Sequence, residues 1–430
     1  MRQSVLISCM SLAFAVTPAE ACPFCAAVAP TFAERIASME VVVLGRLKEA
    51  AEPGEIDPET GDMRASVFAV ERVYQQSETD PVGETVHVVL LDEPQIGELY
   101  FLAADGEPER TWQLPVLVSS RAPAYIDEVL QLPPGPERLR FFLEYLEDED
   151  EAIQRDAYSE FAKTPYDGVQ QLRDHLRRDE LKTWIASETV SLPHRRLYFT
   201  LLGVCGDVAD AAELERLLKS EDENDRAGLD ALIGCYLTLK GEAGLPLIRQ
   251  QFFADDQASS KEIIEAIMAL RFHGNESDVI PRAALLDCLK TVLDRPQLAN
   301  FVIPDLARWE DWSVIGRLQE MFLDAPDNAH YLRVPIINYL AACPLPEGDA
   351  ALQYLKDKNP DAVAQAEAYG MFSEFTAPDL TASPDDGTID GSAGAGPPVA
   401  RQGSPKSGVM SRGTGSWDAD NKKQPNPYPG

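Results

Sequence analysis

The chain of 430 residues carries 71 acidic and 38 basic residues, a formal net charge of −33 at pH 7. This charge argues against partners with phosphate groups, such as nucleic acids and anionic membranes, and favours cations and basic proteins. The equally weighted alternative is that the charge only keeps the protein soluble outside the cytoplasm. Seven cysteines in a chain of this length also exclude a small scaffold held by disulfides.

Residues 1–21 have the pattern of an export signal. A single basic residue, Arg2, precedes an apolar run from Val5 to Val16, and Ala19-Glu-Ala21 offers a small-x-small cleavage site. The apolar run is too short to span a bilayer. We expect a mature, exported chain that begins at Cys22, either periplasmic or secreted. A lipid anchor on Cys22 is the less favoured alternative, because lipoprotein signals place Leu or a similar residue three positions before the cysteine. We expect no other stretch of the sequence to be long and apolar enough to span a membrane.

The expected mature N-terminus carries a short cysteine motif, Cys22-Pro-Phe-Cys25. A thioredoxin-like motif needs a preceding strand and a helix N-terminus that lowers the thiol pKa, whereas only the signal precedes this one. No His follows Cys25 for haem attachment, and no second Cys-x-x-Cys completes a zinc ribbon. We expect a Cys22–Cys25 disulfide, or two thiols, that pins the N-terminus to the domain behind it. A metal held by Cys22 and Cys25 is the weaker alternative, and no cofactor is expected.

Residues 22–132 form a predicted β domain after a short helix at residues 31–39. Segments rich in β-branched and aromatic residues alternate with Gly, Pro and Asp turns. They predict strands at residues 41–47, 65–74, 85–91, 98–103 and 111–118. Five strands of this length suit a small closed barrel of the OB type.

The order of these segments resembles netrin-like domains and the tissue inhibitors of metalloproteinases. The resemblance lies in the N-terminal cysteine motif followed by Val41–Leu47, Phe68–Tyr74 and Glu98–Ala103. It implies that the amino group and carbonyl of Cys22 chelate the zinc of a target protease. The inhibitors, however, have Cys-x-Cys with both cysteines tied to cysteines further along, whereas this domain has Cys-x-x-Cys and no other cysteine.

Residues 133–372 are predicted to be entirely helical. Turn residues break the sequence at intervals of about 30 residues, which is typical of stacked repeats. The breaks are Pro136, Pro165, Pro193, Asp225, Ser260, Pro296, Asp327 and Asn359. Between them, apolar residues recur at the spacing of one helix face, and Asp207 and the Ser259/Glu262 pair predict helix starts.

This stretch resembles the HEAT and armadillo class of α-solenoids, most clearly at Arg196–Asp207 and less regularly at Pro304–Trp312. The resemblance implies helix pairs that stack to bury a common core. The alternative is one irregular helical domain. The whole chain resembles secreted bacterial proteins that pair such a barrel with helical repeats.

Several polar and aromatic features of the chain do not predict a chemical site. The acidic runs at residues 147–151 and 221–225 lack the spacing of a calcium loop and are expected to be solvated connectors. The histidines are expected on surfaces, and Trp309 and Trp312 in the core. No phosphate loop, zinc-protease motif or nucleophile elbow occurs, so we do not expect an enzyme.

Residues 373–430 are rich in Gly, Pro and Ser and are expected to be a disordered tail. Without Arg2, Glu20 and the charged residues from Thr376 onward, 64 acidic and 32 basic residues remain in the body. The sequence therefore favours a non-enzymatic interaction scaffold that binds a protein, with a basic partner favoured, through an acidic helical surface. A metalloprotease inhibitor or metal-binding module acting through Cys22 is the alternative. The oligomeric state is left open.

Overall fold

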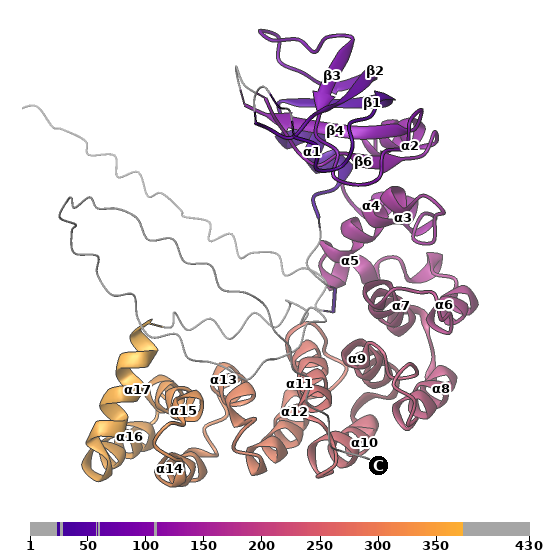
Figure 1. Ribbon diagram of the computed structural model, residues 1–430. Helices are drawn as coiled ribbons and strands as arrows, with labels where there is room; N and C mark the ends of the chain where they lie inside the picture. Colours follow the sequence, from indigo (N-terminus) through magenta and orange to yellow (C-terminus); the bar gives the residue numbers. More distant parts are fainter. Residues whose placement is uncertain (1–23, 26–28, 57, 59–60, 107–109, 373–430) are drawn as a thin grey trace, which may run out of the picture. The chain divides into compact units, whose positions relative to one another are not determined.

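The computed structural model describes residues 24–25, 29–56, 58, 61–106 and 110–372. They belong to one compact unit, residues 1–383. The expected export signal, Cys22 and the expected disordered tail lie outside the described residues. Figure 1 shows a β domain followed by helices.

The β domain is a small, nearly closed antiparallel barrel. Its elements are α1 (Phe32–Ser38), β1 (Val41–Glu49), β2 (Ser66–Gln75), β3 (Thr85–Val88), β4 (Leu99–Asp105), β5 (Thr111–Trp112) and β6 (Val116–Val118). The strand order is β3-β2-β1-β4-β5, and β6 also pairs with β4. One predicted strand, at residues 111–118, is split in two at Pro115, which has no N–H to donate to the ladder.

Strand β1 is buried on both faces. Val41 and Val43 face the interior of the barrel, whereas Val42 and Leu44 belong to the core shared with the helices. Side chains alternate along a strand, so a strand covered on both faces is apolar throughout. A Cβ at Gly45 would lie 2.7 Å from the side chain of Leu102, so glycine lets β4 approach closely.

Sixteen α-helices follow the sheet in the described residues. They are α2 (Ala122–Val129), α3 (Pro136–Leu143), α4 (Glu151–Ala162), α5 (Tyr166–Gln170), α6 (Arg178–Ile185), α7 (Leu192–Cys205), α8 (Val208–Leu218), α9 (Leu229–Lys240), α10 (Leu245–Ile248), α11 (Ser260–Asn275), α12 (Arg282–Leu289), α13 (Ile303–Arg308), α14 (Ile315–Asp324), α15 (His330–Ala342), α16 (Pro346–Lys358) and α17 (Pro360–Phe372). Shorter helical turns are η1 (Arg173–His175), η2 (Gly241–Gly244), η3 (Arg249–Phe253), η4 (Lys290–Asp294) and η5 (Ala299–Phe301).

The predicted breaks mark the odd-numbered helices, because each of the eight lies within seven residues of the start of a helix from α3 to α17; Pro193 is the second residue of α7, and Pro296 lies seven residues before α13. The predicted capping box of Ser259 and Glu262 opens α11, and Asp207 caps α8. Odd-numbered helices pack on one another, as α7 does on α9, α9 on α11, and α15 on α13 and α17 (Figure 1).

Polar contacts between odd-numbered helices recur at a constant separation in sequence. Arg196 Nε on α7 lies 2.9 Å from Asp230 on α9, and Arg271 Nη2 on α11 lies 2.7 Å from Asp305 on α13. In each case the two residues are 34 positions apart. The acid on one helix is therefore neutralised by an arginine on the preceding odd-numbered helix.

The continuous helical stretch Leu229–Phe253 corrects one expectation. By length and composition it could cross a membrane, because it has 25 residues and an 18-residue window with a mean hydropathy of 1.2, but 56% of that window is buried inside the protein. The physical reason is that α9 packs against α7, α8 and α11. A helix covered on several sides is apolar around most of its circumference.

Candidate functional site

The N-terminal cysteine motif is anchored in the helices by Phe24. Its side chain is buried, and its ring centroid lies 4.9 Å from that of Phe272 on α11. Gly234 on α9 makes room for the ring, because a Cβ there would lie 2.7 Å from Phe24 Cζ. Tyr166 of α5 packs edge-on against Phe272 at 4.9 Å. Phe24 thus fixes the motif to the helical body, and the expected pinning of the N-terminus to the domain behind it stays a prediction.

Cys25 is buried and disulfide-bonded. Four cysteines further along the described chain are free: Cys205, Cys235, Cys288 and Cys343. Cys22 lies outside the described residues, so its pairing with Cys25, or a metal on the two, stays a prediction.

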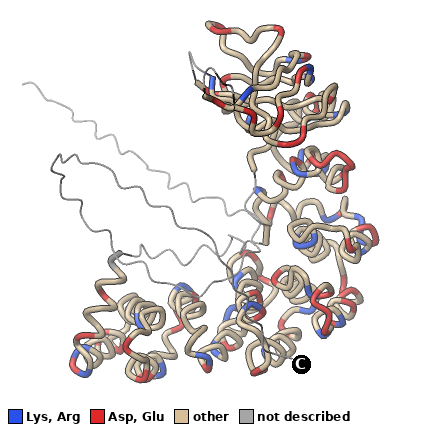
Figure 2. The backbone as a smooth tube through the Cα atoms, viewed as in Figure 1, with Lys and Arg blue, Asp and Glu red and all other residues tan. Residues whose placement is uncertain are grey.

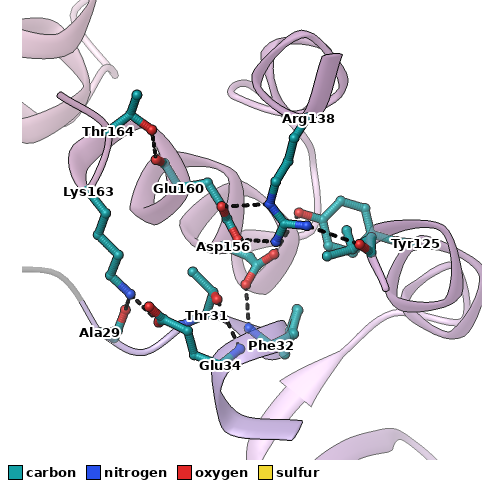
Figure 3. Close-up of polar contacts among 11 residues, drawn as sticks. Ala29, Thr31, Phe32, Glu34, Tyr125, Arg138, Asp156, Glu160, Lys163 and Thr164 are labelled. Atoms are coloured by element: carbon teal, nitrogen blue, oxygen red, sulfur yellow. Dashed lines mark hydrogen bonds and ion pairs between the residues drawn. The ribbon is translucent and has the colours of Figure 1, made fainter. Parts of the chain in front are cut away.

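A buried carboxylate joins the barrel to the helices (Figure 3). Asp156 on α4 accepts a hydrogen bond from the backbone N–H of Phe32 on α1 at 2.6 Å and another from the hydroxyl of Tyr125 on α2 at 2.8 Å. Beside it, Arg138 on α3 pairs with Glu160 on α4 at 2.6 Å. These bonds fix the start of α1 to the first helices of the body.

A second ion pair crosses the same junction. Lys163, at the C-terminus of α4, pairs with Glu34 in the first turn of α1 and donates to the carbonyl of Ala29 at 3.3 Å (Figure 3). Glu34 also completes the capping box of α1 with Thr31. Asp156 on α4 and Lys163 at its C-terminal cap therefore hold the first turn of the short helix before the barrel.

Burial raises the pKa of Asp156 from 3.8 to about 6, against the opposing effect of its two hydrogen bonds. The folded protein therefore binds this proton more tightly than the unfolded chain does. The contribution of Asp156 to stability is full below pH 4 and is lost as the pH rises toward and through 6.

We expect Asp156→Asn to remove this pH dependence. Relative to the variant, the wild-type protein should lose ~2 kcal/mol of unfolding free energy between pH 4 and pH 7, because one pKa unit corresponds to ~1.4 kcal/mol. Urea unfolding of both proteins across this range measures the difference. Asp92→Asn, at an exposed position of the barrel, is the control. A constant difference between wild type and Asp156→Asn would contradict the assignment.

The acidic run at residues 147–151 is more than the solvated connector that was expected. Asp150 caps α4 and accepts the backbone N–H of Ser119 at 2.7 Å. Asp148 pairs with Arg121, and Glu147 accepts the hydroxyl hydrogen of Tyr198. These partners lie on the chain after β6 and on α7, so the run ties the barrel to the helices.

The expectation that the histidines lie on surfaces is wrong for His273, which is fully buried on α11. Its Nε2 lies 3.0 Å from the carbonyl oxygen of Gly234, the residue that receives Phe24. Burial lowers the pKa of His273 to about 4. The ring is therefore neutral at pH 7 and links α9 to α11. Trp309 is buried, as expected.

Ser191 and His194 form a Ser–His contact, with Oγ and Nδ1 2.8 Å apart. The Ser191 hydroxyl also accepts from the His194 backbone N–H, so it is the N-cap of α7. His194 Nε2 is buried without a hydrogen-bond partner among the described residues, so no group there orients the ring as a triad requires. The contact is a helix cap.

A cavity of about 610 Å³ opens between α6, α7 and α8 and the loops that follow α6 and α8. Its apolar lining comes mainly from Ile185, Leu202, Leu214 and Leu217, which are buried, and from Val190 and Leu192. Its charged lining consists of Lys182, Glu188, Arg195, Asp210, Glu213, Arg216, Asp222 and Asp225. The lining therefore combines an apolar floor with eight charged side chains, six of which are within the loop after α6, α8 and the loop after α8.

The charged groups of this cavity differ in how they are neutralised. Lys182 lies 3.3 Å from Asp210 and 2.8 Å from Glu213, so this side is paired. On the other side, Asp225 lies 3.8 Å from Arg216 in a long, exposed contact. The cavity was not foreseen, because its lining comes from four separate segments. Of the sequence features singled out beforehand, the acidic run at residues 221–225 is the one that contributes to the lining of the cavity.

The described residues contain no cluster of three or more His, Cys, Asp or Glu side chains that could hold a metal ion. Comparison of the chain with protein-family models, curated proteins and solved structures gives no match. The candidate functional site is therefore defined by the structure alone, and it is the cavity between α6, α7 and α8.

Proposed function

We propose that this protein is an exported, non-enzymatic scaffold that binds a basic protein through the acidic surface of its helical body. In this proposal the helices stack as HEAT-like repeats after an OB-like, netrin-like barrel. The contacts of Arg196 with Asp230 and of Arg271 with Asp305 support stacking, because each joins two residues that are one repeat length, 34 positions, apart.

The observation that carries the proposal is the loop between α8 and α9, where Figure 2 colours acidic residues red. Glu221, Asp222 and Glu223 are all exposed in this loop, and Asp222 lines the cavity. None of the three forms an ion pair with another described residue. Unpaired carboxylates beside an apolar cavity offer a basic protein both charge complementarity and a surface to bury.

The second candidate, inhibition of a metalloprotease through Cys22, is supported by the barrel. It is less favoured because Phe24 and Cys25 are buried, and Phe24 packs on α9 and α11. A protease zinc would have to approach a residue whose near neighbours are packed into the helical body.

A capture experiment tests the proposal. Partners are first captured from the exported fraction with the mature protein as bait. Association rates of a captured partner are then measured between about 0.05 M and about 0.5 M salt, where screening becomes severe. We expect the rate to fall as salt rises. Glu221→Gln/Asp222→Asn/Glu223→Gln should lower the low-salt rate by about tenfold and flatten the salt dependence.

The matched control removes the same charge from the barrel, in Glu78→Gln/Asp92→Asn/Glu93→Gln, whose positions are also exposed. This variant should bind with nearly the wild-type rate and salt dependence. A partner whose association rate is the same at low and high salt would show that the acidic surface does not recognise it.

A further inference from the structure

We propose that the cavity between α6, α7 and α8 binds a short peptide segment in which Lys or Arg stands next to apolar side chains. This inference rests on the proposed function, because it specifies the part of a basic partner that the helical body holds. It commits the site to a peptide and not to a small anion or a metal ion.

The size and floor of the cavity suit such a segment. Its volume of about 610 Å³ lies within the range of ~300–1,000 Å³ that binding pockets occupy. Buried Ile185, Leu214 and Leu217 form an apolar floor, and the side chain of Leu192 is 42% exposed at its edge. Apolar side chains of a peptide would cover this surface and remove it from water.

The charges place the basic side chain of the peptide beside the loop after α8. Glu188 and Asp222 line the cavity and form no ion pair with the described residues. The contact of Arg216 with Asp225 is 3.8 Å long, and the Arg216 side chain is 65% exposed. Exposed pairs of this kind contribute at most ~1 kcal/mol, so an incoming cation can replace Arg216.

Arg195 supplies a donor for the peptide backbone. Its guanidinium lies in the wall of the cavity, 5.9 Å from the centroid of the Phe199 ring. It forms no ion pair within the described chain, and its Nε has no hydrogen-bond partner there. A backbone carbonyl of the peptide can accept from the guanidinium, whereas the long stem of Lys or Arg packs along the floor.

Fluorescence anisotropy with three end-blocked peptides tests this assignment. The probe alternates Leu and Lys over five residues, a second peptide has Ser in place of each Leu, and a third has Glu in place of each Lys. We expect the Leu/Lys peptide to bind full-length protein at least about tenfold more tightly than either of the others, because both burial and charge are required.

Two variants locate the bound peptide. Ala186→Trp introduces a large side chain at an exposed position in the cavity lining, and Ala212→Trp does so at an exposed position of α8 outside the lining. We expect Ala186→Trp to weaken binding of the Leu/Lys peptide at least about tenfold, and Ala212→Trp to leave it unchanged.

Each contrary outcome has a distinct meaning. Equal binding by both variants, or no binding of the Leu/Lys peptide, would overturn the cavity as the site while leaving a basic partner elsewhere on the body. Tighter binding of the Leu/Glu peptide would overturn the assigned charge. If the Leu/Lys peptide binds in the cavity with an affinity that does not change with salt, the proposal that acidic residues recognise a basic partner would itself be contradicted.

Discussion

Phe24→Ala is expected to lower the free energy of unfolding by about 3–5 kcal/mol, the usual cost of removing a buried Phe side chain. The ring fills the space above Gly234 and contacts Phe272, so its loss leaves a cavity between α9 and α11. Urea unfolding followed by far-UV circular dichroism measures the change. Tyr354→Ala, at an exposed aromatic residue of α16, should cost less than about 1 kcal/mol.

A double-mutant cycle of Phe24 and Gly234 tests directly whether the Phe24 ring packs on Gly234. Gly234→Ala alone should destabilise the protein, because the new Cβ would lie 2.7 Å from Phe24 Cζ and force the ring to move. In the Phe24→Ala background the same change should stabilise by up to about 1 kcal/mol, because Ala favours a helix more than Gly does. The predicted reversal of sign is specific to a ring seated on Gly234.

The reactivity of the Cys235 thiol measures how well the Phe24 ring protects this part of α9. It follows Gly234 on α9 and is buried and free. Loss of the Phe24 ring should raise its rate of alkylation, measured by mass spectrometry of the peptide that carries it. Cys288, buried on α12, serves as the internal control. A Cys235 rate unchanged by Phe24→Ala, together with an additive cycle, would contradict the anchor.

The second large effect is expected at Asp305, which is fully buried on α13. It lies 2.7 Å from both Arg271 and Arg308. Asp305→Ala leaves the mostly buried guanidinium of Arg271 with the carbonyl of Phe301, 3.1 Å away, as its remaining bond in the described residues. Breaking a buried pair from one side costs about 3–5 kcal/mol, and urea unfolding measures it.

An exposed pair provides the matched control. Asp294 and Arg317 are 2.6 Å apart, with side chains 74% and 36% exposed. Asp294→Ala should therefore cost less than about 1 kcal/mol. If Asp305→Ala costs no more than Asp294→Ala, the ion pair between α11 and α13 does not stabilise the packing of the odd-numbered helices.

Tertiary structure decided which surfaces became sites. Phe24 and Phe272 are far apart in the sequence, and so are Phe32 and Asp156. No local sequence pattern indicates that the Phe24 ring packs on Gly234 and not on another glycine. The run at residues 147–151 was expected in solvent, yet Asp150 serves both α4 and Ser119. A carboxylate becomes a cap or a bridge only when the fold brings donors to it.

The sequence alone determined the local elements. Segments rich in β-branched and aromatic residues between turn residues placed the strands, and the spacing of apolar residues and turn residues placed the odd-numbered helices, because both depend on neighbours within a few positions. A single residue can also end a strand, as Pro115 does between β5 and β6. The cavity was decided by the packing of the consecutive helices α6, α7 and α8, and the anchor of Phe24 by packing between segments distant in the sequence, since burial of apolar surface is non-directional and carries no local signature.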